Sequence, residues 1–201
     1  MALAKLASLK AGASWPEAAK IAGQSLRRLL GAEYRELVGL TETEMFAALT
    51  RKSPTHLVPW KMTVLVALLK EAGDVATAQH PPNGGYGWYL KALHLLLEAT
   101  ASKNLLDDPG ILPTADVLLR SIADSPIPVR TRLLLIGEHE RRGEYSGALV
   151  QLRLALEQAP GRPLVKRFAT SLLKRLLGQP EGVLTAGGTT RDELTSALQS
   201  L

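Results

Sequence analysis

Cysteine is absent from the 201 residues, and aromatic side chains make up only 4% of them. Without cysteine the chain has no disulfide bonds and no thiolate metal ligands. No apolar run approaches the roughly 20 residues that a membrane-spanning helix needs, so we expect no membrane partner. Leucine and alanine supply most of the 46% of residues that are hydrophobic, whereas β-branched residues are few. This bias favours helices over strands and predicts an all-α fold.

Acidic residues are missing from the first 16 positions, although the whole chain carries a net charge of only +5. Some targeting segments begin in this way. Lys5 and Lys10 would interrupt the apolar core of a signal peptide, however, and Leu3, Leu6 and Leu9 form a helical stripe instead. We therefore predict that this segment is the first helix of a cytoplasmic protein.

The stretch 130–160 contains two helical patterns that meet at Gly143. In the second pattern, apolar residues recur at the spacing of one helix face. These residues are Tyr145, Ala148, Leu149, Leu152, Ala155, Leu156 and Ala159. Two helical patterns around a short turn predict an antiparallel pair of helices.

This pair resembles a tetratricopeptide repeat, which has a small residue at the turn, then an aromatic residue, an alanine, a large residue, a small residue and a closing proline. The corresponding positions here are Gly143, Tyr145, Ala148, Leu152, Ala155 and Pro160. The first helix departs from the family pattern, with Arg132, Ile136 and His139 where Trp, Gly and Tyr are usual. The resemblance is therefore to a divergent repeat.

The same offsets recur earlier in the chain. One copy consists of Gly87, Tyr89, Ala92, Leu96 and Ala99, and a fainter copy of Trp15, Ala18, Ala22 and Ser25. The spacing between copies is irregular, which indicates that extra helices lie between them. The resemblance implies an all-α array of antiparallel helix pairs, roughly nine to eleven helices in total, whose stacked pairs form a concave binding surface.

The first hundred residues also resemble an uncharacterised family of bacterial tetratricopeptide-like proteins. The shared stretches are 27–31, 68–74 and 89–93. Because that family has no assigned activity, the resemblance implies the fold and nothing about chemistry.

Composition divides the chain into four parts. They are an N-terminal helical part at 1–104, a hinge at 105–113, a C-terminal helical part at 114–178, and a loop with a short terminal helix at 179–201. The hinge is predicted because Asp107, Asp108, Pro109, Gly110 and Pro113 lie close together.

Three helix starts carry the pattern of a capping box, in which a hydroxyl residue precedes a glutamate by three positions. They are Ser14 with Glu17, Thr41 with Glu44, and Thr190 with Glu193. The most apolar helix is expected at 60–79, where several consecutive residues leave no polar face. We expect it in the middle of its domain.

No local motif assembles a catalytic site. The four histidines are His56, His80, His94 and His139. They lack the spacing of metal ligands, and we interpret them as partly exposed helical residues. The glycine loops at 83–87 and 187–190 precede helices but lack the lysine of a phosphate-binding loop, and Asp108 is interpreted as a turn or cap residue. We therefore predict no catalytic residue, no metal site, no cofactor and no enzymatic activity.

A basic helix is a better candidate for a binding surface than the histidines or the glycine loops. Between Gly161 and Gly178 the chain has no acidic residue. The basic residues in this span are Arg162, Lys166, Arg167, Lys174 and Arg175. One interpretation is a surface that follows the phosphates of RNA or DNA, or binds an acidic partner. The other is a solvated helix face whose last basic residues complement the helix dipole.

The aromatic residues suggest one further site. Packing between paired helices accounts for Trp15, Tyr89 and Tyr145, which occupy the aromatic position of the repeat. Trp88 follows a glycine-rich turn, so we expect it to be exposed and to form the rim of a binding groove with Tyr86.

Taken together, these features predict a protein-interaction or scaffolding module. Its expected partner is a peptide, another protein or a second copy of the chain, bound on the concave surface that the repeat resemblance implies. The alternative is a nucleic-acid-binding protein that uses the basic helix 162–175. A regulator that senses a small molecule ranks third, and an enzyme last.

Overall fold

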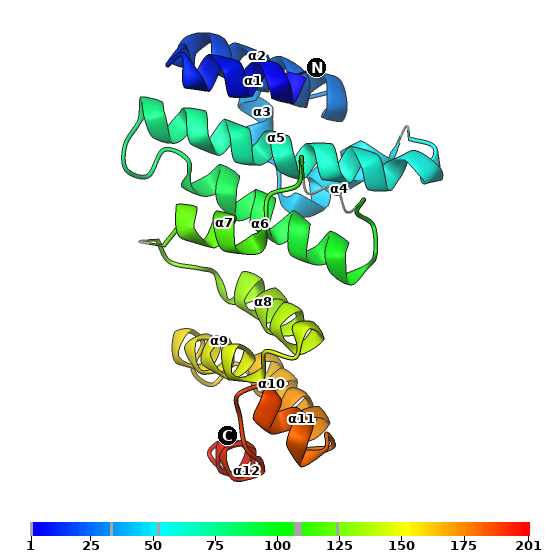
Figure 1. Cartoon of the computed structure of the whole chain (residues 1–201), viewed down its shortest axis with the longest axis vertical. Coiled ribbons are helices and arrows are strands. Elements are labelled where there is room, and N and C mark those ends of the chain that lie inside the picture. The colour runs from blue at the N-terminus through cyan, green and yellow to red at the C-terminus, as the bar shows by residue number, and fades with distance from the viewer. Residues whose placement is uncertain (1, 33, 52, 107–109, 124) are drawn as a thin grey trace. The chain divides into compact units, whose positions relative to one another are not determined.

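The computed structural model describes residues 2–32, 34–51, 53–106, 110–123 and 125–201 (Figure 1). These residues form twelve α-helices and one short 3-10 helix, and no strand occurs among them. The all-α prediction is confirmed, while the number of helices exceeds the predicted nine to eleven. None of the described helices is both long and apolar enough to cross a membrane.

Contacts divide the chain into two units, Met1–Pro126 and Ile127–Leu201. This boundary differs from the predicted hinge at 105–113. Helix α7 (Ala115–Ser121) packs on α6 (Tyr86–Ala101) and so belongs to the first unit, not to the C-terminal part. Of the predicted hinge, Asp107, Asp108 and Pro109 lie outside the described residues.

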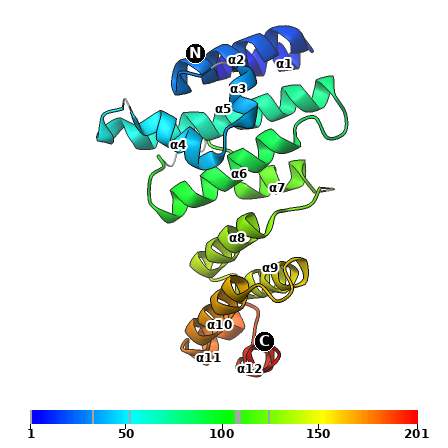
Figure 2. The same ribbon diagram turned by 180° about the vertical axis from the view of Figure 1, so that it is seen from behind.

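Unit 1 is built on a series of helices in which each packs on the next. The remaining helices of this unit are α1 (Ala2–Ala11), α2 (Trp15–Leu30), α3 (Tyr34–Gly39), α4 (Glu42–Arg51), the 3-10 helix η1 (Thr55–Leu57) and α5 (Val58–Gln79). Helix α1 packs on α2, α2 on α5, and α5 on α6. Helix α3 packs on α2, and α4 packs on α2, α5 and α6 (Figure 2).

The central position of α5 follows from its composition. Leu65, Val66, Leu68 and Leu69 are almost completely buried, as expected for a helix that is apolar on all sides. Trp60 is different, because 51% of it is exposed near the start of the helix. Beyond α6, Thr63 of α5 holds the following segment in place through hydrogen bonds to the backbone of Leu106.

Glycines and capping side chains end and begin several helices as predicted. Gly31 and Gly143 adopt left-handed backbone conformations, with φ of 72° and 73°, at the ends of α2 and α8 (Val129–Arg142). The capping boxes at Thr41 and Thr190 are confirmed by reciprocal hydrogen bonds with the third residue of each helix.

The capping box predicted at Ser14 is wrong. Ser14 makes no side-chain cap hydrogen bond, and its ψ of 62° is far from the extended conformation usual for a capping residue. Its backbone N–H instead donates to Leu9 across the turn from α1. Pro16 in the first turn of α2 also removes one of the N–H groups that a cap would satisfy.

Unit 2 contains α8, α9 (Tyr145–Gln158), α10 (Pro163–Leu177), α11 (Glu181–Ala186) and α12 (Arg191–Gln199). Helix α8 packs on α9, and α10 packs on α9 and α12. Its core gathers apolar side chains from all five helices. The buried members are Ile136, Tyr145, Ala148, Leu152, Ala169, Leu172, Leu173, Leu176, Leu184 and Leu194.

Helix α11 lies in the part of 179–201 that was predicted to be a loop before the terminal helix, so this prediction is wrong. Pro180 has the extended backbone that precedes a helix, and Glu181 places an acid in the first turn. Leu184 is completely buried and anchors this helix in the core of unit 2. The six-residue helix contains Gly182 and is too short to give a clear periodic pattern.

Candidate functional site

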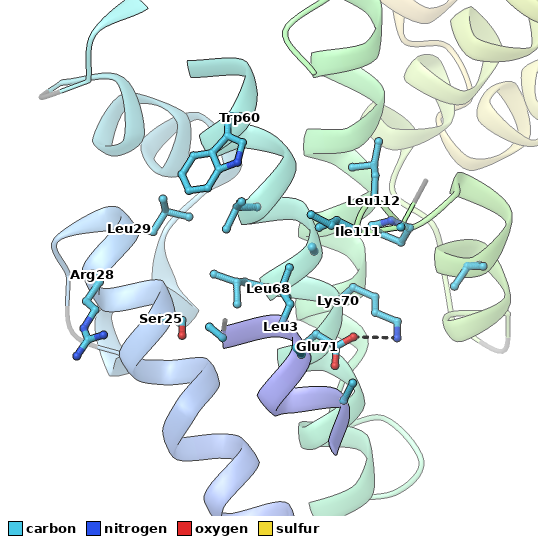
Figure 3. A pocket seen from close by; sticks show the side chains of 18 residues that line it. Leu3, Ser25, Arg28, Leu29, Trp60, Leu68, Lys70, Glu71, Ile111 and Leu112 are labelled. Carbon is cyan, nitrogen blue, oxygen red and sulfur yellow. Dashed lines mark hydrogen bonds and ion pairs between the residues drawn. The ribbon is translucent and has the colours of Figure 1, made fainter. Parts of the chain in front are cut away.

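An open groove of about 930 Å³ lies in unit 1 (Figure 3). Helices α1, α2, α5 and α7 and the segment before α7 form its walls, and most of the lining is apolar. The apolar lining includes Leu3, Ala4 and Ala7 of α1, Leu29 of α2, Val64, Ala67 and Leu68 of α5, and Ile111, Leu112 and Val117 from the remaining wall. We call this feature the unit 1 groove.

Solvent reaches the groove because several lining side chains are only partly covered. Trp60 is 51% exposed and Ile111 is 38% exposed. Ala4 and Ala7 are also exposed on α1, where a soluble helix would normally carry polar residues. The groove is therefore an uncovered apolar surface and not an enclosed cavity.

Polar side chains lie at the edges of the groove and are largely bonded to the protein itself. The Ser25 hydroxyl donates to the carbonyl of Ile21 at 2.8 Å. Lys70 pairs with Glu71 at 3.2 Å, as the dashed line in Figure 3 marks. Arg28 is exposed on α2 and has no carboxylate partner in the described part of the chain.

A network of charged groups fixes α1 against α5 beside the groove. Asp74 accepts hydrogen bonds from Lys10 of α1, from Lys70 at 2.8 Å, and from the hydroxyl of Tyr89 on α6 at 2.9 Å. Glu71 also accepts from Lys10, at 2.7 Å. Three helices thus meet at one carboxylate, which holds two walls of the groove in position.

Burial and the neighbouring charged groups shift the pKa values of three members of this network. Burial alone would raise the pKa of Asp74, but hydrogen bonds from Lys10 and Lys70 outweigh burial and hold this pKa below its usual value. Burial raises the pKa of the Tyr89 hydroxyl to about 12, with Asp74 adding to the effect. Burial would lower the pKa of Lys70, yet Asp74 and Glu71 raise it.

We expect stability of unit 1 to fall at both extremes of pH. The folded pKa of Asp74 lies below its unfolded value, so its contribution is present above about pH 4 and is lost as pH falls through the folded pKa. The folded pKa of Tyr89 lies above its unfolded value of about 10, so its contribution is lost as pH rises from about 10 to 12.

Urea unfolding at pH 3, 7 and 11 measures this dependence. Asp74→Asn should remove part of the loss at pH 3, and Tyr89→Phe should remove part of the loss at pH 11. If each variant lost as much stability as the original chain at these pH values, Asp74 and Tyr89 would not be the groups responsible.

The predicted aromatic rim does not form. Trp88 was expected to be exposed, but only 6% of it is accessible, and Lys91 lies 5.8 Å from its ring centre. Tyr86 is half-buried, and its hydroxyl donates to the carbonyl of Pro126 at 2.5 Å. Trp88 is buried because it occupies the α6 face that packs against neighbouring helices. Trp60 is instead the exposed tryptophan at the groove.

The alanine, leucine and tyrosine positions of the two clearer repeat copies are all buried. They are Tyr89, Ala92, Leu96 and Ala99 in α6, and Tyr145, Ala148, Leu152 and Ala155 in α9. His94 corrects the expectation that the histidines are partly exposed, because it is 2% exposed and its Nε2 lies 3.0 Å from Glu98. Within the described residues, no group of three or more potential ligands could hold a metal ion.

The predicted basic residues all lie on the surface of unit 2. Arg162 precedes α10, and Lys166, Arg167, Lys174 and Arg175 project from the helix as exposed side chains. They do not have equal surroundings. Arg175 forms a two-point ion pair with Glu140, with both N–O distances at 2.8 Å.

Sequence reasoning missed the residues of the unit 1 groove. Two signals were present in the chain. Exposed alanines on α1 stand where a solvated helix usually carries charges, and Ile111 and Leu112 are apolar within a segment rich in glycine and proline. Neither signal says which other elements converge on the same place.

Comparisons with known proteins add no relative to this geometry: no family model, curated protein or solved structure matches the chain.

Proposed function

We propose that this chain is a non-enzymatic protein-interaction module that binds an amphipathic helix of a partner protein in the unit 1 groove. The observation that carries the proposal is an open apolar groove of about 930 Å³ with the half-exposed Trp60 at its edge. An amphipathic helix buries its apolar face in such grooves, and tryptophan is a frequent energetic anchor of interfaces.

The open shape favours a protein segment over a small molecule. The volume falls within the range of about 300–1000 Å³ typical of small-molecule sites, but such sites bury most of their ligand. Here Trp60 and Ile111 remain substantially exposed. Ser25 and the Lys70–Glu71 pair are already hydrogen-bonded within the protein, so they offer little to orient a polar ligand.

Charge near the groove selects an acidic partner. Residues 2–31, which form the α1 and α2 walls, contain five basic residues and one acidic residue. Arg28 lines the groove, whereas Lys5 and Lys20 lie on the same two helices outside its lining. None of the three has a carboxylate partner among the residues that the structure describes. A helix with leucines on one face and glutamates on the other complements both the apolar lining and this charge.

This function accords with the resemblance to tetratricopeptide repeats, whose helix pairs serve protein binding. The pairs α1 with α2, α5 with α6, and α8 with α9 are then divergent repeats of one ancestral unit. A cytoplasmic location of the protein is part of the same proposal. A second copy of the chain is the competing occupant, and it would give a dimer mass in light scattering.

The proposal predicts binding of a synthetic 18-residue amphipathic helix. Its apolar face carries leucine at positions i, i+3, i+4 and i+7, and its polar face carries glutamate and glutamine. We expect saturable binding by calorimetry and a blue shift of Trp60 emission, because the helix removes water from this indole. Trp60→Phe should abolish the spectral shift.

The matched control is the same peptide with lysine in place of every glutamate. It should bind at least about tenfold more weakly, because it repels the basic walls of the groove. Equal affinity for the two peptides would contradict the charge argument. Binding of the glutamate peptide without any change in Trp60 emission would contradict the location.

A further inference from the structure

In the described part of unit 2, the exposed cations without an acidic partner lie on α10 and at the residue before it. Arg162, Arg167 and Lys174 are exposed and have no acidic partner among the residues that the structure describes. Arg132 of α8 donates to the neutral amide oxygens of Gln151 and Gln158. Several other arginines of this unit are paired with carboxylates. The pairs are Arg141 with Glu138, Arg153 with Glu157, Arg175 with Glu140, and Arg191 with Glu181. Exposed and unpaired positive charge is therefore concentrated along α10 and at its N-cap residue, Arg162.

A shallow hollow of about 480 Å³ accompanies these cations. It is lined by Lys166, Arg167, Thr170, Ser171, Lys174 and Leu201, with no carboxylate side chain among them. Lys166 uses one of its three donors on the backbone oxygen of Leu201, at 2.7 Å. Lys166 is therefore not counted among the unpaired cations.

Arg175 is paired with Glu140, but it also orients the hydroxyl group of Ser171 in this hollow. Glu140 fixes its guanidinium from one side, and Nη1 of Arg175 donates to Oγ of Ser171 at 3.0 Å. Because the Ser171 oxygen acts as acceptor there, its own hydrogen is left to donate to an incoming anion. Arg175 is thus a positioning residue for Ser171.

These donors fit phosphate groups. Arginine, lysine, serine and threonine side chains supply most protein contacts to the phosphates of nucleic acids. The cations extend from Arg162 to Lys174, which is about 18 Å along a helix at 1.5 Å per residue. This length exceeds a single phosphate and suits a charged polymer.

We propose that the α10 surface binds the phosphate backbone of double-stranded nucleic acid without reading its sequence. Single strands are usually held by bases stacked on aromatic side chains. No aromatic residue lines the hollow, and Phe168 of the same helix packs against the core of unit 2. Contacts to phosphates alone carry no information about base sequence.

Fluorescence anisotropy with two labelled 20-base-pair duplexes of unrelated sequence tests this proposal. Both duplexes should bind with equal affinity. Displacement of about three counterions should weaken binding about 40-fold between 50 and 200 mM salt. Arg167→Glu combined with Lys174→Glu should weaken binding at least about tenfold at 50 mM salt, because it replaces two attractions by repulsions.

The matched control is Arg141→Glu combined with Arg153→Glu, which makes the same change in net charge at arginines that already have acidic partners. Circular dichroism checks that both variants keep their helices, and Arg167→Gln with Lys174→Gln serves if the reversal does not fold. An equal loss in the control, or no saturable binding at 50 mM salt, would overturn the proposal. Tighter binding of a 20-nucleotide single strand, or displacement of the duplex by polyglutamate at equal charge, would also overturn it.

Discussion

Gly73→Ala is expected to destabilise unit 1 by about 1–3 kcal/mol, the usual cost of overpacking a core. A Cβ atom at this position would lie 2.5 Å from Cε1 of the Tyr89 ring. The ring cannot move aside easily, because its hydroxyl donates to Asp74 and the backbone of Gly85 lies close to its other edge. This closeness is clear from Gly85 itself, where an added Cβ would lie 2.6 Å from Cε2 of the ring. The close contact between α5 and α6 therefore requires glycine.

Urea unfolding followed by tryptophan emission measures this effect selectively, since Trp15, Trp60 and Trp88 all belong to unit 1. Gly87→Ala is the control, because it lies in α6 with nothing within 4 Å of the added Cβ. It should leave stability unchanged or raise it by up to about 1 kcal/mol, since alanine favours helices over glycine. Equal destabilisation by both variants would show that contact with Tyr89 is not the cause.

Ala7→Glu is expected to weaken binding of the glutamate peptide at least about tenfold. Ala7 is exposed on α1 and lines the groove, so the substitution leaves the core of unit 1 intact. A carboxylate there would be pressed against an apolar face and would repel the acidic partner, and burying an unpaired charge costs more than the 1.4 kcal/mol that equals tenfold.

Ser8→Glu is the matched control for this variant. Ser8 is the next residue of the same helix, is also exposed, and does not line the groove. Calorimetry should find that Ser8→Glu changes affinity by less than about threefold, the scale of an exposed charge pair. A loss of similar size in both variants would mean that net charge on α1, and not the groove, governs binding.

Local patterns in the sequence were sufficient for most of the helices and for many of their ends. Gly143 ends α8 because a left-handed residue is needed there, and Thr41 and Thr190 cap helices through bonds within four residues. Buried alanines such as Ala148 follow from one-face periodicity. Each of these features depends on residues close together in the chain.

The candidate site depends on contacts between residues far apart, which periodicity does not encode. Lys10 and Asp74 are 64 positions apart, yet their ion pair sets one wall of the groove. The sequence does not show which of Trp60 and Trp88 is buried. In the structure, α6 places Trp88 inward, whereas Trp60 is half-exposed. Which apolar side chains remain uncovered is decided by tertiary packing alone.

Hydrogen exchange, with and without the glutamate peptide at saturation, tests the central claim most directly. Binding in the unit 1 groove predicts slower amide exchange in α1, in α5 and at 110–113, because the bound helix suppresses local opening of the groove walls. Residues 127–201 should exchange at unchanged rates. Protection confined to 127–201, or no protection anywhere at saturation, would contradict the proposal that this groove is the binding site.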